Sequence, residues 1–312
     1  MREFFLLIAV LSAGFAQAAV GSAELQRRID AAPFGSLELD EGVYEISETL
    51  VITNACSLRM HQNAVLRAVK PMACVVDANL IAVRNDSYRM AITGGTIDGN
   101  GLASCLQADG FCHFTLRDTC FLNGKEYGLW SGGRRLHDCE LIAENLYFKC
   151  TKRGLAGNTA VRVSGSDDHF TDIIVLDWTV GFDLPTGVHN RFTRCHVWGG
   201  RIPPAKPGEE REMLKNSVAF RTGPDAWHNF FHQCYADTAK IGFDNAGNDS
   251  LYTGCVYYNN YKSYKLDDVI AVRQTGGSIR FFDGVLSKSC PKFRAYEGTG
   301  KIQWRSTVNQ PK

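Results

Sequence analysis

The stretch 192–195 reads Phe192-Thr193-Arg194-Cys195, and its pattern, an aromatic residue three positions before a cysteine or an aliphatic residue, recurs along the chain. The recurrences lie about 22 residues apart, or further where extra residues intervene. A repeat of this length with short β-rich runs is typical of a solenoid whose coils bury their apolar residues against one another. The other segments are Phe170-Thr171-Asp172-Ile173, Phe231-His232-Gln233-Cys234, Tyr252-Thr253-Gly254-Cys255 and Phe282-Asp283-Gly284-Val285.

Stacking of such coils predicts columns of equivalent side chains about 4.8 Å apart, the spacing of paired strands. We interpret the repeated cysteines as small buried hydrophobes, in a column that Ile173 interrupts. The spacing also permits disulfides between neighbouring coils, and Cys105 with Cys112 is a better candidate pair outside the column. The expected aromatic column is Phe170, Phe192, Phe231, Tyr252 and Phe282, and the expected cysteine column is Cys120, Cys139, Cys195, Cys234 and Cys255.

The first 18 residues have the pattern of a secretory signal peptide. Met1-Arg2 is weakly positive, residues 4–11 are apolar, and Ala16-Gln17-Ala18 is a small-residue cleavage site. The apolar run is too short for a membrane span. We therefore expect residues 1–18 to be removed on export, residues 19–312 to form one domain, and the protein to be secreted or periplasmic.

The charge of the chain excludes one class of partner. Its 34 Lys and Arg residues balance 33 Asp and Glu residues, which leaves a formal net charge of +1. A nucleic-acid-binding protein normally carries a basic excess or stripe, so no nucleic-acid partner is expected. No nucleotide-binding loop, nucleophile elbow or zinc-protease motif is present.

The N-terminal region resembles the opening of a pectate-lyase-like right-handed parallel β-helix. The residues that carry the resemblance are Leu25-Gln26, Ile29-Asp30-Ala31-Ala32, Gly35, Leu37, Leu39, Gly42-Val43-Tyr44, Ile46 and Leu50-Val51-Ile52. A second segment, Gly94-Gly95-Thr96-Ile97-Asp98-Gly99, is similar to a coil of the polygalacturonase-type members. The resemblance implies an all-β, single-stranded right-handed parallel β-helix. We expect a short amphipathic helix, with Ser22 as its N-cap, to cover the first coil.

An outward-facing series of charges follows from this fold. From Arg162 to Arg273 the sign alternates over five coils. The arrangement can be a surface ion-pair ladder, in which each pair contributes about 0–1 kcal/mol, or a cleft in which arginines hold carboxylates or sulfates of a glycan. Asp183 and Asp244 would lie about 9.6 Å apart, borderline for an inverting glycosidase, but a carboxyl group between arginines suits binding better than proton donation. The series is Arg84, Trp130, Arg162, Asp183, Arg221, Asp244 and Arg273.

A second outward face follows the cysteine column. His196 and Asp237 could move protons, and Trp198 and Tyr258 could stack on sugar rings, although an exposed strand with scattered aromatics explains the same residues. Insertions at 143–158, 199–216 and 259–268 enter at one corner, and the proline-rich 199–216 segment is either a wall of a cleft or a solvated loop. At another corner, Asp168, Asn190, Asn229 and Ser250 predict a side-chain hydrogen-bond ladder.

The sequence thus predicts an exported carbohydrate-active protein, a polysaccharide lyase or a glycoside hydrolase acting on a glycan that the arginines suggest is acidic. The alternative is a non-catalytic β-helix that binds a glycan or a protein. Of the polygalacturonase-type motifs only Asp167-Asp168 is present, out of context, and the calcium-binding pattern of pectate lyases is missing, so no metal or other cofactor is expected. The catalytic candidates are Asp183, Asp244 and Arg221, and the substrate-binding candidates are Arg162, Arg273, Trp130, His196, Trp198, Asp237 and Tyr258.

Overall fold

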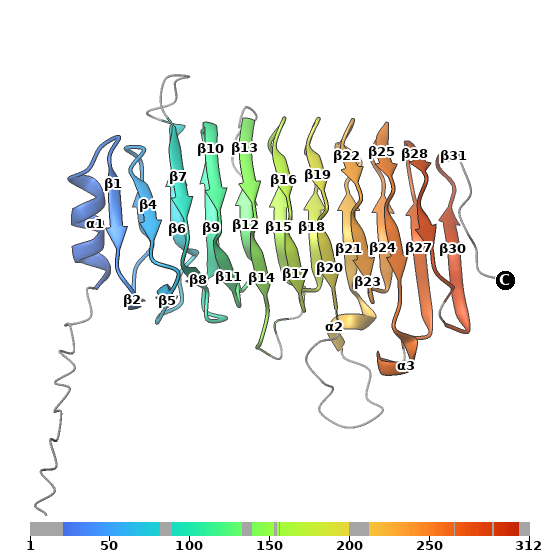
Figure 1. The fold of residues 1–312 in the computed structure, drawn as a ribbon, viewed down its shortest axis with the longest axis horizontal. Coiled ribbons are helices and arrows are strands. Elements are labelled where there is room, and N and C mark those ends of the chain that lie inside the picture. Colours follow the sequence, from blue (N-terminus) through green and yellow to red (C-terminus); the bar gives the residue numbers. More distant parts are fainter. Residues whose placement is uncertain are drawn as a thin grey trace, which may run out of the picture.

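The chain winds into a stack of coils, and each coil contributes one strand to each of three parallel sheets (Figure 1). The computed structural model describes residues 21–81, 89–132, 139–152, 155, 157–199, 212–264, 266–288 and 290–305. Within them, one sheet has 11 strands and the other two have 10 each, which confirms the predicted parallel β-helix.

The three sheets are named A, B and C in the order in which each coil visits them. Sheet A contains β1 (Ser36–Leu39), β4 (Ser57–Met60), β7 (Met90–Thr93), β10 (Cys112–Arg117), β13 (Cys139–Glu144), β16 (His169–Thr171), β19 (Arg191–Thr193), β22 (Phe230–His232), β25 (Ser250–Thr253), β28 (Ser278–Phe282) and β31 (Lys301–Arg305). Sheet B contains β2 (Gly42–Ile46), β5 (Ala64–Ala68), β8 (Thr96–Asp98), β11 (Cys120–Leu122), β14 (Tyr147–Lys149), β17 (Ile174–Leu176), β20 (His196–Trp198), β23 (Tyr235–Asp237), β26 (Val256–Tyr258) and β29 (Val285–Leu286). Sheet C contains β3 (Leu50–Ile52), β6 (Cys74–Asn79), β9 (Ser104–Asp109), β12 (Tyr127–Ser131), β15 (Thr159–Val163), β18 (Val180–Leu184), β21 (Val218–Thr222), β24 (Ile241–Asn245), β27 (Asp268–Gln274) and β30 (Lys292–Gly298).

The predicted aromatic column lies on the inner face of sheet A. The rings of Phe170 and Phe192 stack with centroids 4.9 Å apart, and Phe231 and Tyr252 continue the stack at 4.8 and 4.5 Å. The last member was predicted wrongly. Tyr252 pairs with Phe281, which is 1% exposed, and not with Phe282, because the repeat motif is shifted by one residue in this coil.

The cysteine column is shorter than predicted. Cys195, Cys234 and Cys255 are fully buried free thiols in consecutive coils, as expected. Cys120 aligns with Tyr147 of the neighbouring coil, one position beyond the column. Cys139 lies opposite Cys112 in the strand register of sheet A, and so lies outside the column. Cys105 is a free thiol that donates to the Leu122 carbonyl at 3.2 Å, so the expected Cys105–Cys112 bridge is not formed.

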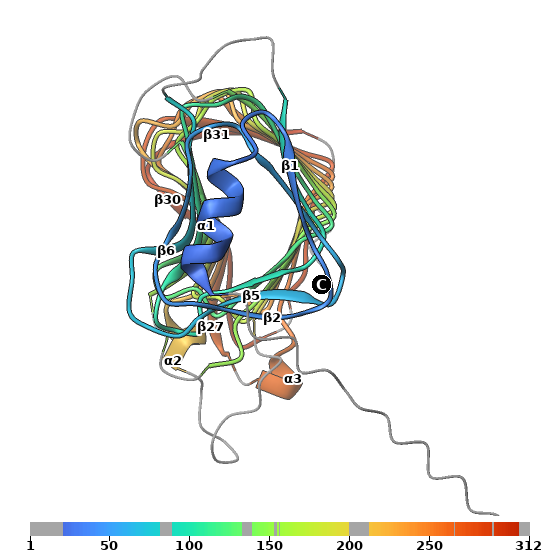
Figure 2. The same ribbon diagram turned by 90° about the vertical axis from the view of Figure 1, so that its left-hand side faces the viewer.

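Helix α1 (Ser22–Asp30) lies across the open end of the first coil, as predicted (Figure 2). Leu25 and Ile29 are fully buried on one face of the helix. Ser22 is not the N-cap, because Gly21 takes that position and the Ser22 hydroxyl instead accepts a hydrogen bond from the Ser47 backbone N–H at 2.7 Å. The helix therefore docks through its side chains onto the edge of the solenoid.

The corner between sheets C and A carries the predicted ladder of polar side chains. Asn190 Oδ1 accepts from the Asp168 backbone N–H at 2.9 Å, and Asn229 Oδ1 accepts from the Asn190 backbone N–H at 3.0 Å. These residues are fully buried, so the ladder satisfies backbone donors that the corner would otherwise leave unpaired. Ser250 is buried at the equivalent place in the next coil.

The insertions lie between sheets B and C. The first part of the 143–158 segment contains the end of β13, the corner at 145–146 and all of β14, so the extra residues of this coil follow Lys149 and do not begin at residue 143. Helix α2 (Glu212–Lys215) ends the 199–216 insertion, whose residues 200–211 lie outside the described residues, and helix α3 (Tyr261–Tyr264) belongs to 259–268. No helix in the described ranges is long and apolar enough to cross a membrane.

Candidate functional site

The alternating charges form one column on the outer face of sheet C. The strand register places each predicted residue opposite the next, which confirms the spacing of one coil between neighbours. Arg84 lies outside the described residues, and Gln107 occupies the position before Trp130. The members and their strands are Trp130 (β12), Arg162 (β15), Asp183 (β18), Arg221 (β21), Asp244 (β24) and Arg273 (β27).

Asp183 is held between two arginines. Arg221 donates from Nε to its Oδ1 at 2.8 Å, and Arg162 Nε lies 3.8 Å from its Oδ2. The Asp183 side chain is 10% exposed, whereas those of Arg162 and Arg221 are 40% and 39% exposed. The hydrogen bond to Asp183 raises the pKa of Arg221 above its ordinary value. The carboxylate thus lies beneath the surface and holds two cationic groups at the surface.

Asp244 makes a similar but separate pair. Arg273 donates to both carboxylate oxygens of Asp244, from Nε at 2.8 Å and from Nη2, and these bonds raise the pKa of Arg273. Asp183 and Asp244 are therefore both engaged by arginines, an arrangement suited to fixing guanidinium groups in place. Neither Asp244 nor Arg273 lines the pocket described next.

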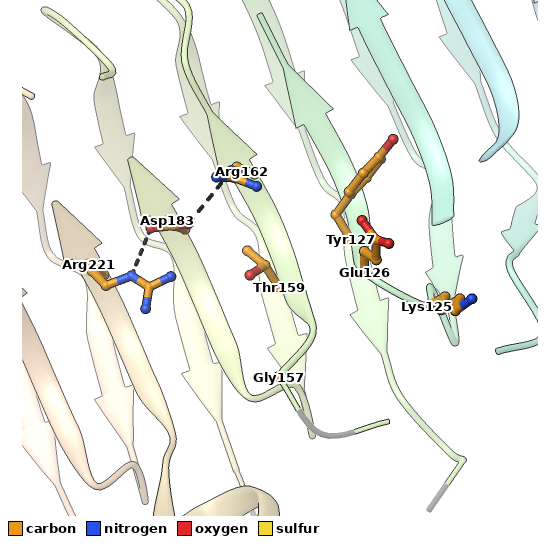
Figure 3. Close-up of a pocket in the computed structure, with 8 residues that line it drawn as sticks. All are labelled: Lys125, Glu126, Tyr127, Gly157, Thr159, Arg162, Asp183 and Arg221. Carbon is orange, nitrogen blue, oxygen red and sulfur yellow. Dashed lines mark hydrogen bonds and ion pairs between the residues drawn. The ribbon is translucent and has the colours of Figure 1, made fainter. Parts of the chain in front are cut away.

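A pocket of about 330 Å³ opens beside the column (Figure 3). Arg162 and Arg221 come from the wall that carries Asp183, and Lys125 and Glu126 approach from the turn before β12. Three cationic side chains therefore border one hollow, together with the exposed carboxyl group of Glu126. The lining residues are Lys125, Glu126, Tyr127, Gly157, Thr159, Arg162, Asp183 and Arg221.

Trp130 packs against two of the pocket's lining residues, Arg162 and Tyr127. The Arg162 guanidinium lies over the Trp130 ring, 5.0 Å from its centroid, and the Tyr127 ring meets Trp130 edge-on at 5.3 Å. Tyr127 donates its hydroxyl hydrogen to Gln107 Oε1 at 3.1 Å, and burial raises the pKa of this phenol. Tyr127 is therefore a neutral hydrogen-bonding group at physiological pH, and the aromatic pair fixes the position of Arg162.

The second predicted face lies on sheet B. Trp198, Asp237 and Tyr258 occupy opposed positions in three consecutive coils, and the His196 ring stacks on Tyr235 with centroids 4.6 Å apart. His196 Nε2 lies 4.0 Å from Asp237 Oδ2. Burial raises the pKa of Asp237 and lowers the pKa of His196, so this pair is better suited to proton transfer than the carboxylates of sheet C.

The described ranges contain no group of three or more histidine, cysteine, aspartate and glutamate side chains close enough to hold a metal ion. The pocket on sheet C is lined by three cationic side chains and by the carboxylates of Glu126 and Asp183.

No protein-family model and no curated protein matches the sequence. Solved structures do match. Alginate lyase from Paenibacillus sp. str. FPU-7 superposes with a TM-score of 0.59 and 15% identity, over 92% of this chain and 97% of that one. The chain is a right-handed parallel β-helix.

Two further β-helices extend this comparison. PfbA, a surface adhesin of Streptococcus pneumoniae, gives a TM-score of 0.54 at 12% identity, over 91% of this chain and 86% of that one. The enzymatically active domain of tailspike protein 2 from bacteriophage CBA120 gives a TM-score of 0.51 at 10% identity, over 91% of this chain and 43% of that one. The β-helix spans 58% of the matched protein ORF18 of Geobacillus virus E2. At these identities the matches establish the fold.

Several pocket residues of the β-helix were not found from the sequence. Lys125 and Glu126 belong to a turn, where the repeat pattern carries no signal. Tyr127 and Thr159 could have been found, because each lies three positions before a predicted outward-facing residue of sheet C. That residue is Trp130 in one case and Arg162 in the other.

Proposed function

We propose that this protein binds an acidic polysaccharide along the outer face of sheet C and cleaves it at the pocket beside Asp183. The observation that carries the proposal is the pair of arginines, Arg162 and Arg221, that a buried carboxylate holds at the edge of a 330 Å³ hollow. Guanidinium groups bind carboxylates and sulfates through paired hydrogen bonds. A solenoid suits a chain-like ligand because successive coils repeat their contacts at a fixed pitch.

The role of each group follows from its chemistry. Arg221 and Arg162 neutralise an acid group of the sugar, and Lys125 adds a third cation on the opposite side of the pocket. Neutralising the carboxylate of a uronic acid makes the neighbouring C–H more acidic, which is the requirement for cleavage by elimination. Glu126 is the exposed carboxylate available as a base in the same pocket. The match to a protein described as an alginate lyase supports this chemistry.

We also propose that the protein is exported, with residues 1–18 as a cleaved signal peptide. An extracellular or periplasmic location gives access to polysaccharides.

The test uses the purified protein on acidic polysaccharides, such as alginate and polygalacturonate, and on neutral ones. New reducing ends together with ultraviolet absorbance of an unsaturated product indicate elimination, and reducing ends alone indicate hydrolysis. Arg221→Ala should lower affinity for an acidic substrate by about 10- to 100-fold, the loss of about 1.5–3 kcal/mol of charged hydrogen bonding.

Two variants separate binding from folding. Arg221→Ala removes the hydrogen-bond donor of the buried Asp183, at a cost of about 1–3 kcal/mol of stability. Arg221→Lys keeps the charge but not the planar fork, so it should retain most stability and still bind acidic substrate weakly. Arg194→Ala is the control, because Arg194 makes a solvent-exposed pair with Asp172 at 2.7 Å, away from the pocket. If Arg194→Ala and Arg221→Ala lost the same amount of affinity for an acidic substrate, the proposal would be contradicted.

The alternative is glycan binding without cleavage. It is favoured by one observation, namely that Asp183 and Asp244 are both engaged by arginines, and the match to a surface adhesin supports it. Retained binding of acidic glycan that needs Arg221, with no product of either kind, would establish this alternative.

A further inference from the structure

A second ladder of titratable side chains lies at the corner between sheets C and A, apart from the pocket. Asp167, His189, His228 and Asp249 occupy equivalent positions in four consecutive coils, as the bridges between the residues just before them show. All four have left-handed backbone conformations, with φ between 51° and 58°. The corner therefore presents one of these side chains from each of four consecutive coils, in a row along the solenoid.

The two histidines meet end to end. His189 Nε2 lies 3.1 Å from His228 Nδ1, and the ring planes differ by 19° with centroids 5.3 Å apart. Each outer nitrogen faces a carboxylate: His189 Nδ1 lies 4.0 Å from Asp167 Oδ1, and His228 Nε2 lies 3.5 Å from Asp249 Oδ2. The order along the corner is carboxylate, imidazole, imidazole, carboxylate.

Proton counting shows what this order requires. Two neutral imidazoles carry two ring protons, whereas an N–H facing each carboxylate together with the hydrogen bond between the inner nitrogens would take three. The two carboxylates leave a net negative charge when the histidines are neutral, so the ladder favours one extra cation between the inner nitrogens. Two nitrogens bound to one tetrahedral zinc ion at about 2.0–2.1 Å lie about 3.3–3.4 Å apart, so the inner nitrogens, 3.1 Å apart and joined by a hydrogen bond, need to separate by a few tenths of an ångström and turn toward the ion to bind it.

We propose that His189 and His228 bind one late first-row divalent cation, Zn²⁺, Ni²⁺ or Cu²⁺, through Nε2 and Nδ1. The outer N–H of each ring then faces Asp167 or Asp249, the contact that orients metal-binding histidines in proteins. The imidazole side chains are 43% and 40% exposed, so water completes the coordination and the ion exchanges with solvent. In the described ranges no third ligand joins them, which makes this a two-histidine site.

Trp227 provides the optical signal for this site. Its ring is 43% exposed and lies 5.0 Å from the His189 ring and 4.7 Å from the His228 ring. Bound Cu²⁺ at this distance quenches indole fluorescence, whereas Zn²⁺ does not. The site is independent of the proposed polysaccharide function, and its test needs no substrate.

The experiment titrates the mature protein at pH 7.5 with Zn²⁺ and Ni²⁺ by calorimetry, and with Cu²⁺ by fluorescence. We expect one site, with Mg²⁺ and Ca²⁺ giving no signal because imidazole prefers the late transition metals. His189→Asn and His228→Asn should each weaken binding at least 10-fold, and asparagine tolerates the left-handed backbone of both positions. Trp227→Phe should lose the quenching by Cu²⁺ and keep the calorimetric binding of Zn²⁺.

His232→Asn is the matched control, since His232 is an exposed histidine on the outer face of β22. It should bind as the wild type does. Equal binding by His189→Asn, His228→Asn and the wild type would overturn the proposal and place the metal elsewhere, for example on a thiol. Absence of binding by the wild type would also overturn it, and would mean that the two rings share a proton.

Discussion

Asp183 determines the position of the arginines at the pocket, since it contacts both while its own side chain is 10% exposed. Asp183→Asn keeps the side-chain shape and removes the charge. We expect about a 10-fold rise in KM for an acidic substrate with kcat little changed, because the arginines lose the group that fixes them. Asp172→Asn, in the exposed Asp172–Arg194 pair, is the control. A 10²-fold or larger fall in kcat would instead assign proton transfer to Asp183.

We expect His196 to make the stability of the protein depend on pH. Burial lowers its pKa in the folded state below the value of about 6.5 expected in the unfolded chain. The unfolded state therefore binds a proton first as pH falls, and stability is lost below about pH 6.5 with a slope of at most about 1.4 kcal/mol per pH unit. Urea unfolding at pH 7.5 and 5.5 should show a smaller loss for His196→Gln. An identical loss in both proteins would show that His196 does not contribute.

The residues of the site were predictable to different degrees. Arg162, Asp183 and Arg221 follow buried strand positions at a constant offset, so the period of the repeat predicts that they align. Lys125 and Glu126 belong to a turn whose conformation no period describes. The facing of His189 and His228 depends on a corner that joins residues 39 positions apart, and the variable coil lengths obscure it in the sequence.

The rings that stack on the inner face of sheet A from β16 to β28 give a test of register. Phe281 is 1% exposed and pairs with Tyr252, whereas Phe282 is partly exposed at the end of β28. Phe281→Ala should cost about 3–5 kcal/mol in the free energy of unfolding, as for other buried phenylalanines, and Phe282→Ala should cost clearly less. Chemical denaturation of the two variants measures the difference. A larger cost for Phe282→Ala would restore the register expected from the sequence.

The same coil shows why the sequence could predict the elements but not every register. Neighbouring residues of a strand point to opposite faces, so a shift by one residue exchanges inside and outside. Phe281 and Phe282 are both aromatic, and the motif fits either one. Cys120 illustrates the same ambiguity on sheet B, where Thr119, which precedes it, is 1% exposed.

At the scale of the molecule, the stack of coils has ends, and an uncovered end would expose strand edges to other chains. Helix α1 covers the first coil (Figure 2), and its Leu25 and Ile29 are fully buried. Gln26 also pairs with the backbone of Val51 in β3, donating to its carbonyl and accepting from its N–H, each at 2.8 Å. The side chain thus takes the place of a neighbouring strand.

Removal of this cap should act locally. The double variant Leu25→Asp and Ile29→Asp should undock α1, because each buried aliphatic side chain contributes about 2–5 kcal/mol at such a site. Coils of a solenoid contact only their neighbours, so the aromatic column around Phe192 should persist while the first coil becomes available for association. We expect a higher mass by light scattering and an unchanged near-ultraviolet circular dichroism spectrum, with Arg27→Ala, on the exposed face of α1, behaving as the wild type. Loss of the whole near-ultraviolet spectrum would mean that the helix stabilises every coil, and an unchanged mass would mean that α1 is not what protects the edge.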